Sequence, residues 1–364
     1  MPNEQTNPRI ITFYLPQFHP TPENDEWWGP GFTEWTNVAK AKPSFRGHYQ
    51  PHLPADLGFY DLRLAETRIA QAELAASYGI GGFCYYHYWF HGDRMLGRIL
   101  DEVHGSGEPD FPFSICWANE SWTKTWVGGD SDILIHQTYS DEDDLAHIRY
   151  LIPFFEDRRY IRVNGRPLFV IYNIETLGDR VERLQDIWNK ELQAAGIPEL
   201  YLCCVRHEPP AGFEASINFF PNFGLIPFSN LDKLKYGYIR KLGTAYKHTI
   251  ANYSDVVSNI MDMTYPDYRM YHCPVPSWDN TPRRSELGSL ILKDSTPAVF
   301  QKWMEFALKD TTNRFQDEEQ ILFVNAWNEW AEGTHLEPDQ KWGHGYLEAV
   351  RNAIQSVNKR PDTK

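Results

Sequence analysis

Short apolar runs alternate with amphipathic stretches along most of this chain. Eight of the apolar runs have the length of a strand, and several precede segments in which apolar residues recur at helical spacing. The predicted strands cover residues 9–16, 79–89, 111–120, 167–173, 200–207, 215–221, 270–280 and 320–329. The predicted helices lie within residues 62–79, 144–157, 181–196 and 297–310, and Gly79 is positioned to end the first of them.

This alternation predicts an α/β protein with parallel strands, because a crossover helix returns the chain to the same end of the sheet. Eight such units match a (β/α)8 TIM barrel with long βα loops, expected to form a single domain over residues 1–364 with its core at 9–355. The alternative is a doubly wound open sheet, but no glycine-rich nucleotide-binding motif follows the first strand. The fifth and sixth units are the weakest part of the prediction, since only residues 208–214 separate their strands.

Polar and aromatic side chains gather at the predicted C-terminal ends of the strands, whereas the strand starts are apolar. In a (β/α)8 barrel these ends converge on the active site. The end of the eighth strand carries Glu329 and Glu332, which are the predicted catalytic residues. The residues expected to bind substrate are Glu120, Asp279, Asn119, Trp117, Trp122, Tyr85, His87, Trp35, Trp278, Asn328 and Trp330.

Carboxylates beside aromatic rings suit the cleavage of glycosidic bonds. One carboxylic acid protonates the leaving oxygen, and a second carboxylate acts as nucleophile or base. Aromatic residues make up 15% of the chain, and flat sugar faces stack well on such rings. The pattern therefore indicates a carbohydrate-active enzyme, with an oligo- or polysaccharide as its partner.

Each carboxylate also has a structural interpretation. Glu329 and Glu332 could cap the helix that follows them. Glu120 could belong to an ion pair, and Asp279 could close an Asx turn before Pro282.

Three further acidic residues rank behind these four. Glu34 lies in the long loop after the first predicted strand and is a secondary candidate. Glu337, next to Pro338, is interpreted as a surface residue, and Asp339 as a loop residue outside the site.

Neither a metal nor a cofactor is expected. His87 and His91 have a metal-like spacing, but on a strand this spacing fixes no ligand geometry and no third ligand accompanies them. A nucleophilic serine motif is absent from the sequence. The five cysteines lie in apolar contexts and are expected to be reduced thiols of the core.

The net charge of −14 disfavours nucleic acid as a partner, because an acidic surface repels phosphate groups. A mildly basic segment at residues 233–247 is interpreted as a solvated helix face. No run reaches transmembrane length, and the first residues do not resemble a signal peptide. A cytoplasmic protein without a membrane segment is expected; the sequence carries no signal for an oligomeric state.

Several long motifs resemble the WbsX-type proteins, which are described as polysaccharide-biosynthesis proteins or glycosyltransferases. They are the segments 14–63, 82–96, 117–126, 277–283 and 325–339, the last reading NAWNEWAEGTHLEPD. The resemblance extends over roughly residues 10–345. A narrower resemblance, carried by the Glu-Trp-x-Glu-Gly-Thr pattern that begins at Glu329, is to glycoside hydrolase family 99, the endo-α-mannosidases and endo-α-mannanases.

The family 99 resemblance implies a (β/α)8 barrel and a retaining mechanism through a 1,2-anhydro sugar. Glu329 would act as a base on the sugar 2-hydroxyl, and Glu332 would protonate the leaving group and later activate water. Such a route implies α-linked manno- or rhamno-configured substrates. Ala331 replaces a histidine of the family pattern, which leaves the reaction class in place and the substrate open.

The expected activity is therefore a retaining, endo-acting glycoside hydrolase on a polysaccharide or O-antigen glycan. One alternative is a glycosyltransferase of lipopolysaccharide or O-antigen biosynthesis, for which DSD at 130–132 and DED at 141–143 match a DxD metal motif in letters only. Another is a carbohydrate-binding barrel without catalysis. The partner of Glu329 also stays open between Glu332 and a residue across the barrel, Glu120 or Asp279.

Overall fold

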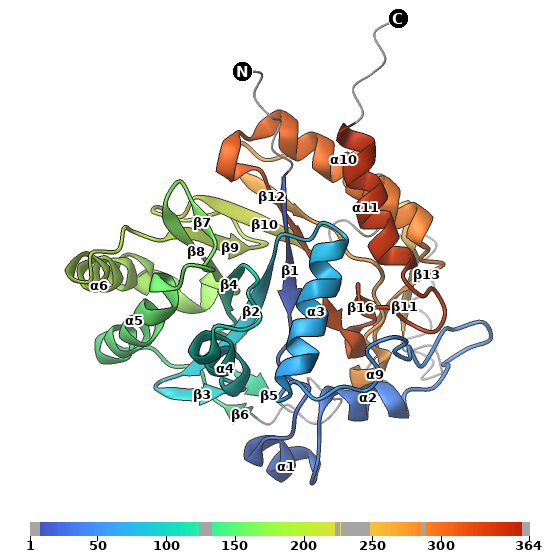
Figure 1. The fold of residues 1–364 in the computed structure, drawn as a ribbon, viewed down its shortest axis with the longest axis horizontal. Helices are drawn as coiled ribbons and strands as arrows, with labels where there is room; N and C mark the ends of the chain where they lie inside the picture. Colours follow the sequence, from blue (N-terminus) through green and yellow to red (C-terminus); the bar gives the residue numbers. More distant parts are fainter. Residues whose placement is uncertain (1–7, 124–132, 223–225, 227–247, 285–287, 359–364) are drawn as a thin grey trace, which may run out of the picture.

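The computed structural model describes residues 8–123, 133–222, 226, 248–284 and 288–358, and it confirms the predicted (β/α)8 barrel (Figure 1). Eight parallel strands follow one another in the order β12-β10-β9-β8-β4-β2-β1-β14. Their bounds are β1 Arg9–Tyr14, β2 Gly82–Phe90, β4 Phe113–Trp117, β8 Arg166–Ile171, β9 Tyr201–Val205, β10 Ala215–Phe219, β12 Met270–Cys273 and β14 Ile321–Val324. All eight predicted strands are present.

The barrel is nearly closed where β12 lies beside β14, and the amide of Asn325 donates to the carbonyl of Pro274 at 3.1 Å. Aromatic rings fill the interior. Phe13 of β1 contacts Phe219 of β10 and Phe323 of β14, with ring centroids 5.0 and 5.6 Å apart. The contact with Phe219 crosses the barrel and the contact with Phe323 joins neighbouring strands, so side chains fill the space beneath the C-terminal ends of the strands.

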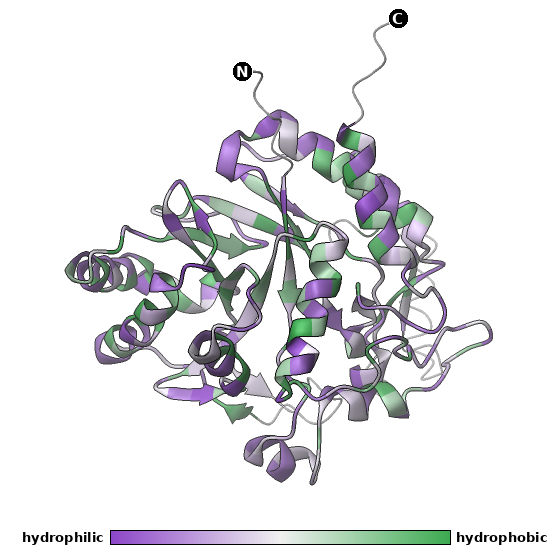
Figure 2. Ribbon diagram, viewed as in Figure 1, coloured by the Kyte–Doolittle hydropathy of each residue, from purple (hydrophilic) through white to green (hydrophobic). Residues whose placement is uncertain are grey.

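Seven helices cover the outside of the barrel in the described part of the chain, and the four predicted helices are among them. They are α3 Ala65–Ser77, α4 Arg98–Ser106, α5 Asp141–Glu156, α6 Val181–Ala194, α8 Tyr253–Met261, α10 Pro297–Arg314 and α11 Gly345–Asn358. Hydrophobic and hydrophilic residues alternate along them, as expected for helices with one buried face (Figure 2). Residues 206–214 contain no helix, which explains why the fifth and sixth units gave the weakest pattern.

The loops at the C-terminal ends of the strands carry most of the smaller elements. In Figure 1 α1, α2 and α9 lie at the lower end of the barrel, toward which the arrow of β1 points. The elements of these loops are α1 Pro22–Trp28, α2 Glu34–Lys40, β5 Trp122–Thr123, β6 Ile133–Ile135, η2 Ile174–Arg180, β11 Thr249–Asn252, α9 Thr281–Arg284, β13 Leu290–Lys293, β15 Asn328–Glu329, η5 Trp330–Glu332 and β16 Thr334–His335. The remaining short elements are β3 Asp93–Met95, β7 Arg162–Val163 and η4 Asp317–Glu319.

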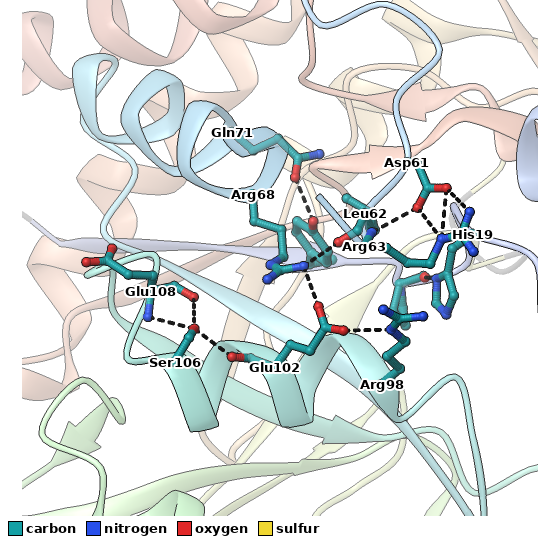
Figure 3. A network of polar contacts seen from close by, with 12 residues as sticks. His19, Asp61, Leu62, Arg63, Arg68, Gln71, Arg98, Glu102, Ser106 and Glu108 are labelled. Carbon is teal, nitrogen blue, oxygen red and sulfur yellow. Dashed lines mark hydrogen bonds and ion pairs between the residues drawn. The ribbon is translucent and has the colours of Figure 1, made fainter. Parts of the chain in front are cut away.

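A buried arginine ties the end of the long β1–α3 loop to the helix ring (Figure 3). Arg68 of α3 donates to the carbonyl of Leu62 at 2.6 Å and to Glu102 of α4 at 2.8 Å. Glu102 also accepts a hydrogen bond from Arg98. The loop therefore returns to the barrel at a fixed point, which fixes the position of the residues it carries.

Two other expectations concern the whole chain. All five cysteines are buried and unpaired, as expected for core thiols. Within the described ranges, no helix has the length and apolar character needed to cross a membrane. The DSD motif at 130–132 and the basic segment at 233–247 lie entirely outside the described residues.

Candidate active site

A cavity of about 900 Å³ opens at the C-terminal end of the barrel. Four ionisable groups of the loops reach it: Glu34 of α2, Arg283 of α9, and the predicted catalytic residues Glu329 and Glu332. Glu120, which follows β4, lines it as well. The aromatic side chains in its wall are Trp28, Tyr86, Tyr88, Trp122, Tyr172 and Phe219.

Glu329 and Glu332 belong to a tight turn that follows the barrel strand. β14 ends at Val324, so the predicted extension of this strand to Glu329 is wrong. The chain instead forms a hairpin in which β15 pairs antiparallel with β16, and η5 makes the turn. The side chain of Asn328 fastens the hairpin to β1, because its amide bonds both the N–H and the carbonyl of Leu15, at 2.7 and 3.0 Å.

Gly333 allows this turn to approach the loop after β12. Its φ of +64° favours glycine, and a Cβ there would lie 2.9–3.0 Å from atoms of Asp279. The amide of Asp279 donates to the carbonyl of Glu332 at 2.7 Å. The turn that carries both glutamates is therefore held against the segment that carries Arg283.

Arg283 contacts three carboxylates at once. Its Nη2 lies 2.8 Å from Glu329 Oε2, and its Nη1 lies 2.8 Å from Glu332 Oε1. Its Nε donates to Glu34 Oε1 at 2.6 Å. Glu34 is 1% exposed and Glu329 is 5% exposed. One guanidinium therefore faces three carboxyl groups in a largely buried cluster, which has a formal excess of negative charge when all three are ionised. Glu329 precedes η5 but makes no side-chain cap, which argues against the capping interpretation of this residue.

The electrostatics of this cluster favour retention of a proton. Burial raises the pKa of Glu329 to about 8, and the neighbouring Glu332 and Glu34 add to the rise, while Arg283 opposes it. Burial also raises the pKa of Glu332. Because the two groups interact, the titration belongs to the pair rather than to either residue.

Two asparagines offer free hydrogen-bonding groups to a ligand. Asn24 is 1% exposed and lines the cavity, yet its side-chain oxygen and nitrogen have no hydrogen-bond partner among the described residues. The side-chain oxygen of Asn37 is in the same situation. Buried amides without partners are costly in a folded protein, and a polar ligand in the cavity would satisfy them.

The two faces of β2 correct one part of the sequence prediction. Successive residues of a strand point to opposite faces. Tyr86 and Tyr88 line the cavity, whereas Tyr85 contacts Phe113 outside the barrel interior and His87 bonds His147 of α5 at 3.0 Å. Tyr85 and His87 therefore lie on the wrong face to bind substrate.

Trp117 and Asn119 lie outside the cavity as well. Trp117 is fully buried between the barrel and the helices, where it contacts His147 and Trp188. Asn119 is fully buried and holds the loop after β8, because its side chain bonds both the N–H and the carbonyl of Asn173. These corrections share one cause, since the end of a strand also supplies the residues that fasten the neighbouring loops.

Glu120 and Trp122, two of the predicted substrate-binding residues, do line the cavity. Glu120 accepts a hydrogen bond from Asn173 at 2.7 Å and has no ion-pair partner in the described ranges, contrary to its structural interpretation. The ring of Trp122 contacts Tyr88 at 5.1 Å. Both therefore stay candidates for substrate binding.

Trp35, Asn328 and Trp330 support the site without lining it. Trp35 and Trp330 contact each other at 5.4 Å and are buried. Trp330 stacks on His335 at 3.7 Å and donates from Nε1 to Glu337 at 2.6 Å. These rings form a rigid layer behind the turn of Glu329 and Glu332.

Asp279 and Trp278 border a second cavity, of about 630 Å³. The carboxylate of Asp279 accepts from His48 at 2.6 Å and Gln50 at 2.7 Å, and its other oxygen accepts from the amide of Thr281. This Asx-type contact is the structural alternative considered for Asp279. Asp279 is therefore not placed to pair with Glu329.

Glu337 was predicted to be a surface residue and Asp339 a loop residue. Both side chains are buried instead. Glu337 accepts hydrogen bonds from Trp330, Gln71 and Tyr60 at 2.6–2.8 Å. Burial raises its pKa to about 7. It joins α3, the β1–α3 loop and the β15–β16 hairpin.

The sequence analysis missed Arg283, Asn24, Tyr86 and Tyr88, and ranked Glu34 too low. Successive residues of β2 face opposite sides of the barrel wall. One known inward-facing residue would therefore have distinguished Tyr86 and Tyr88 from Tyr85 and His87. Arg283 had no distinguishing signal, because Arg284 follows it directly in the same polar loop.

Comparisons with known sequences place this chain among bacterial relatives. A family model described as "Glycosyltransferase WbsX" matches residues 10–350. Two proteins named "Uncharacterized protein WxcX", from two strains of Xanthomonas campestris pv. campestris, are 38% identical over 358 residues. That match covers 97% of this chain and 50% of theirs, so the chain spans about half the length of these relatives.

Solved structures with a similar fold include a "Glycoside hydrolase-like protein", with a TM-score of 0.59 and 13% identity over 96% of this chain and 94% of that one. The GH99 endo-alpha-mannosidase from Bacteroides thetaiotaomicron has a TM-score of 0.54 and 13% identity, over 96% of this chain and 97% of that one. At this level of identity the likeness concerns the barrel fold.

Proposed function

This chain belongs to the WbsX glycosyltransferase family, and we propose that it is a retaining, endo-acting glycoside hydrolase. Its substrate would be an α-linked manno- or rhamno-configured polysaccharide, such as an O-antigen glycan. The observation that carries the proposal is the pair Glu329 and Glu332, which line one open cavity and are joined through Arg283.

The proton balance of the pair supports acid–base chemistry. Glycoside cleavage requires one carboxyl group to give a proton and the other to be ionised. The raised pKa values of Glu329 and Glu332 favour a pair that keeps a proton at neutral pH. In our assignment this proton resides on Glu332, the more exposed of the two side chains, when the glycan is bound.

The proposed route uses the sugar 2-hydroxyl as the internal nucleophile. Glu329 takes the proton of this hydroxyl while O2 attacks C1, and Glu332 protonates the leaving oxygen as the bond from C1 breaks. Water then opens the 1,2-anhydro ring at C1; Glu332 accepts a proton from the water, and Glu329 returns its proton to O2. The two inversions at C1 give net retention. The role assignment rests on the resemblance of the Glu329–Thr334 segment to family 99.

The rest of the cavity suits a neutral or weakly charged glycan. Trp28, Trp122 and Tyr88 offer flat rings for sugar faces, and the unpartnered side-chain amide of Asn24 and side-chain oxygen of Asn37 offer hydrogen bonds to hydroxyls. Arg283 is already occupied by three carboxylates, so it is not available to bind an anionic substituent.

The test is incubation with a panel of α-mannans and α-rhamnans, with product size measured by chromatography and anomeric configuration by NMR. Wild-type protein should release oligosaccharides with retained configuration. Glu329→Gln and Glu332→Gln should each lower the rate about 10³-fold or more, whereas Glu348→Gln, on the exposed face of α11, should leave it unchanged. Wild-type rates in either site variant would overturn the assignment. Cleavage of a glycan methylated at O2 would overturn the 2-hydroxyl route alone.

The family description makes a glycosyltransferase the second candidate. The same panel distinguishes it when activated sugar donors are added, since a transferase would lengthen the acceptor and consume the donor. Binding of the glycan without any bond cleavage or formation would instead favour a non-catalytic barrel.

A further inference from the structure

A second group of ionisable side chains lies beside the second cavity, away from Glu329 and Glu332. His52 comes from the β1–α3 loop, His335 from β16, and Asp339 from the segment that follows β16. All three are buried, and one ligand atom of each lies within 4.8 Å of the others. We propose that His52, His335 and Asp339 bind a divalent first-row transition-metal ion, for which Zn²⁺ is the natural probe.

The spacing of the donor atoms suits such an ion. Two ligand atoms bound tetrahedrally to Zn²⁺ at about 2.0–2.1 Å lie roughly 3.3 Å apart. His52 Nδ1 lies 3.1 Å from His335 Nε2, close to this value. His335 Nε2 lies 3.9 Å from Asp339 Oδ2, about half an ångström more than this value, and all three ligand atoms lie within 4.8 Å of one another.

Outer contacts already orient these donor atoms. The Nδ1 of His335 bonds the carbonyl of Glu337 at 3.0 Å, which directs the Nε2 lone pair toward the cluster. The Oδ1 of Asp339 accepts from the amides of Lys341 and Trp342, and the Tyr49 hydroxyl also interacts with this carboxylate, so its position beside the two histidines is fixed. Metal-binding histidines and carboxylates are commonly held in this way.

The second cavity gives the cluster an opening to solvent. His52 and Asp339 line this cavity, so a cation could enter and a water molecule could complete the coordination. The combination of two imidazoles and one carboxylate prefers transition metals to Ca²⁺ or Mg²⁺, which favour oxygen ligands alone.

The chain contains a matched control for this proposal. His87 and His147 are also buried, and their Nε2 atoms lie 3.0 Å apart, much as in the pair His52 and His335. Of the described residues, only the group with Asp339 has a third ligand atom in range. A histidine–histidine hydrogen bond alone would give both pairs the same behaviour, whereas a metal site would distinguish them.

The experiment is titration of the full chain with Zn²⁺ by calorimetry, followed by dialysis and measurement of bound zinc by mass spectrometry. We expect one equivalent per chain in the wild type and in His147→Gln, and a loss of affinity of at least about 100-fold in His335→Gln and Asp339→Asn. Glu329→Gln should bind zinc as the wild type does, so this proposal and the proposed function can fail separately.

Circular dichroism checks that each variant is folded, and a variant that fails is replaced by His52→Gln. Bound Co²⁺ gives a second readout, because its visible absorption depends on the ligands and should disappear in the variants of the cluster. Absence of stoichiometric zinc in the wild type, or zinc binding as tight as the wild type's in His335→Gln and Asp339→Asn, would overturn the proposal.

Discussion

Two buried glutamates lie in or next to the β15–β16 hairpin, Glu329 and Glu337, and burial raises the pKa of both. Glu329 reaches about 8 and Glu337 about 7. Their neighbours differ. Glu337 is enclosed by neutral donors from Trp330, Gln71 and Tyr60, whereas Glu329 contacts the cationic Arg283 and borders an open cavity.

The comparison shows that a raised pKa alone does not identify a catalytic carboxyl group. A carboxyl group whose acceptor positions are filled by fixed donors has little capacity left for a substrate, so its burial is structural. A carboxyl group with an open side and a charged partner can exchange a proton with a bound ligand. The neighbours of each group, rather than its pKa, distinguish the proposed catalytic role of Glu329 from the structural contacts of Glu337.

The strongest test exchanges the two glutamates for glutamine in parallel. Glu329→Gln should lower kcat about 10³-fold while the fold keeps its stability, because glutamine resembles the protonated side chain that burial favours. Glu337→Gln should keep kcat within a few-fold but lose about 2–3 kcal/mol of unfolding free energy, because the new amide group meets donors rather than acceptors. Steady-state kinetics and urea unfolding measure the two effects. An inactive but stable Glu337→Gln would contradict the division of roles.

Arg283→Lys tests whether one guanidinium holds the cluster together. Lysine cannot reach three carboxylates with the same geometry, so we expect about 3 kcal/mol less stability and strongly reduced activity. The neighbouring Arg284 is exposed, and Arg284→Lys is the matched control. Equal unfolding midpoints of the two variants would show that the cluster does not depend on Arg283.

The pH dependence should follow the proton of the pair. If the reaction needs one proton on Glu329 and Glu332 together, kcat/KM falls as pH rises above about 8, where this proton is lost. The folded-state pKa of Glu329 lies above its ordinary value of 4.5, so unfolding free energy should also fall as pH rises toward 8. Its contribution to the slope is at most about 1.4 kcal/mol per pH unit.

Glu329→Gln should remove this part of the stability profile. The difference from wild type should be clearest above pH 7, because the pKa of Glu337 lies at about 7 and its contribution is largely exhausted there. Urea unfolding across this range provides the measurement. A wild-type stability that rises toward pH 8 would have the wrong sign for a buried glutamate with a raised pKa.

The smallest expected effect separates the two faces of β2. Tyr86→Phe removes a hydroxyl from the cavity wall and should raise KM roughly fivefold, the value of about one hydrogen bond. Tyr85→Phe removes a hydroxyl outside the barrel interior and should leave KM unchanged. Michaelis–Menten kinetics on the cleaved glycan decide between them. Equal KM values in the two variants would remove Tyr86 from the site.

The pattern of apolar runs predicted the barrel because a barrel strand is buried on both faces and a surrounding helix on one, as β1 and α10 illustrate. The ends of the strands were harder. The sequence indicates that 85–88 lie at such an end, but not whether the odd or the even residues face inward, since both are aromatic or polar. The sequence analysis predicts substrate contacts for Tyr85 and His87, whereas the structure has Tyr86 and Tyr88 in the wall of the cavity.

Long-range pairing was not readable from one sequence. Arg283 and Glu34 are 249 positions apart, and the pattern of neither segment specifies the other. The burial of Glu337 was missed for the same reason, because two of its donors, Gln71 and Tyr60, lie more than 260 positions away.

These distances along the chain have a consequence for the order of folding. Asn328 bonds Leu15 across 313 positions, at the seam where β14 pairs with β1. Closing so large a loop is entropically costly, and contacts of this kind form late. A barrel opened at this seam would keep most of its strands and helices while its glutamates separate from Glu34. Enzymatic activity would then depend on the pairing of β14 with β1. Mild denaturation should abolish activity before circular dichroism records any loss of secondary structure.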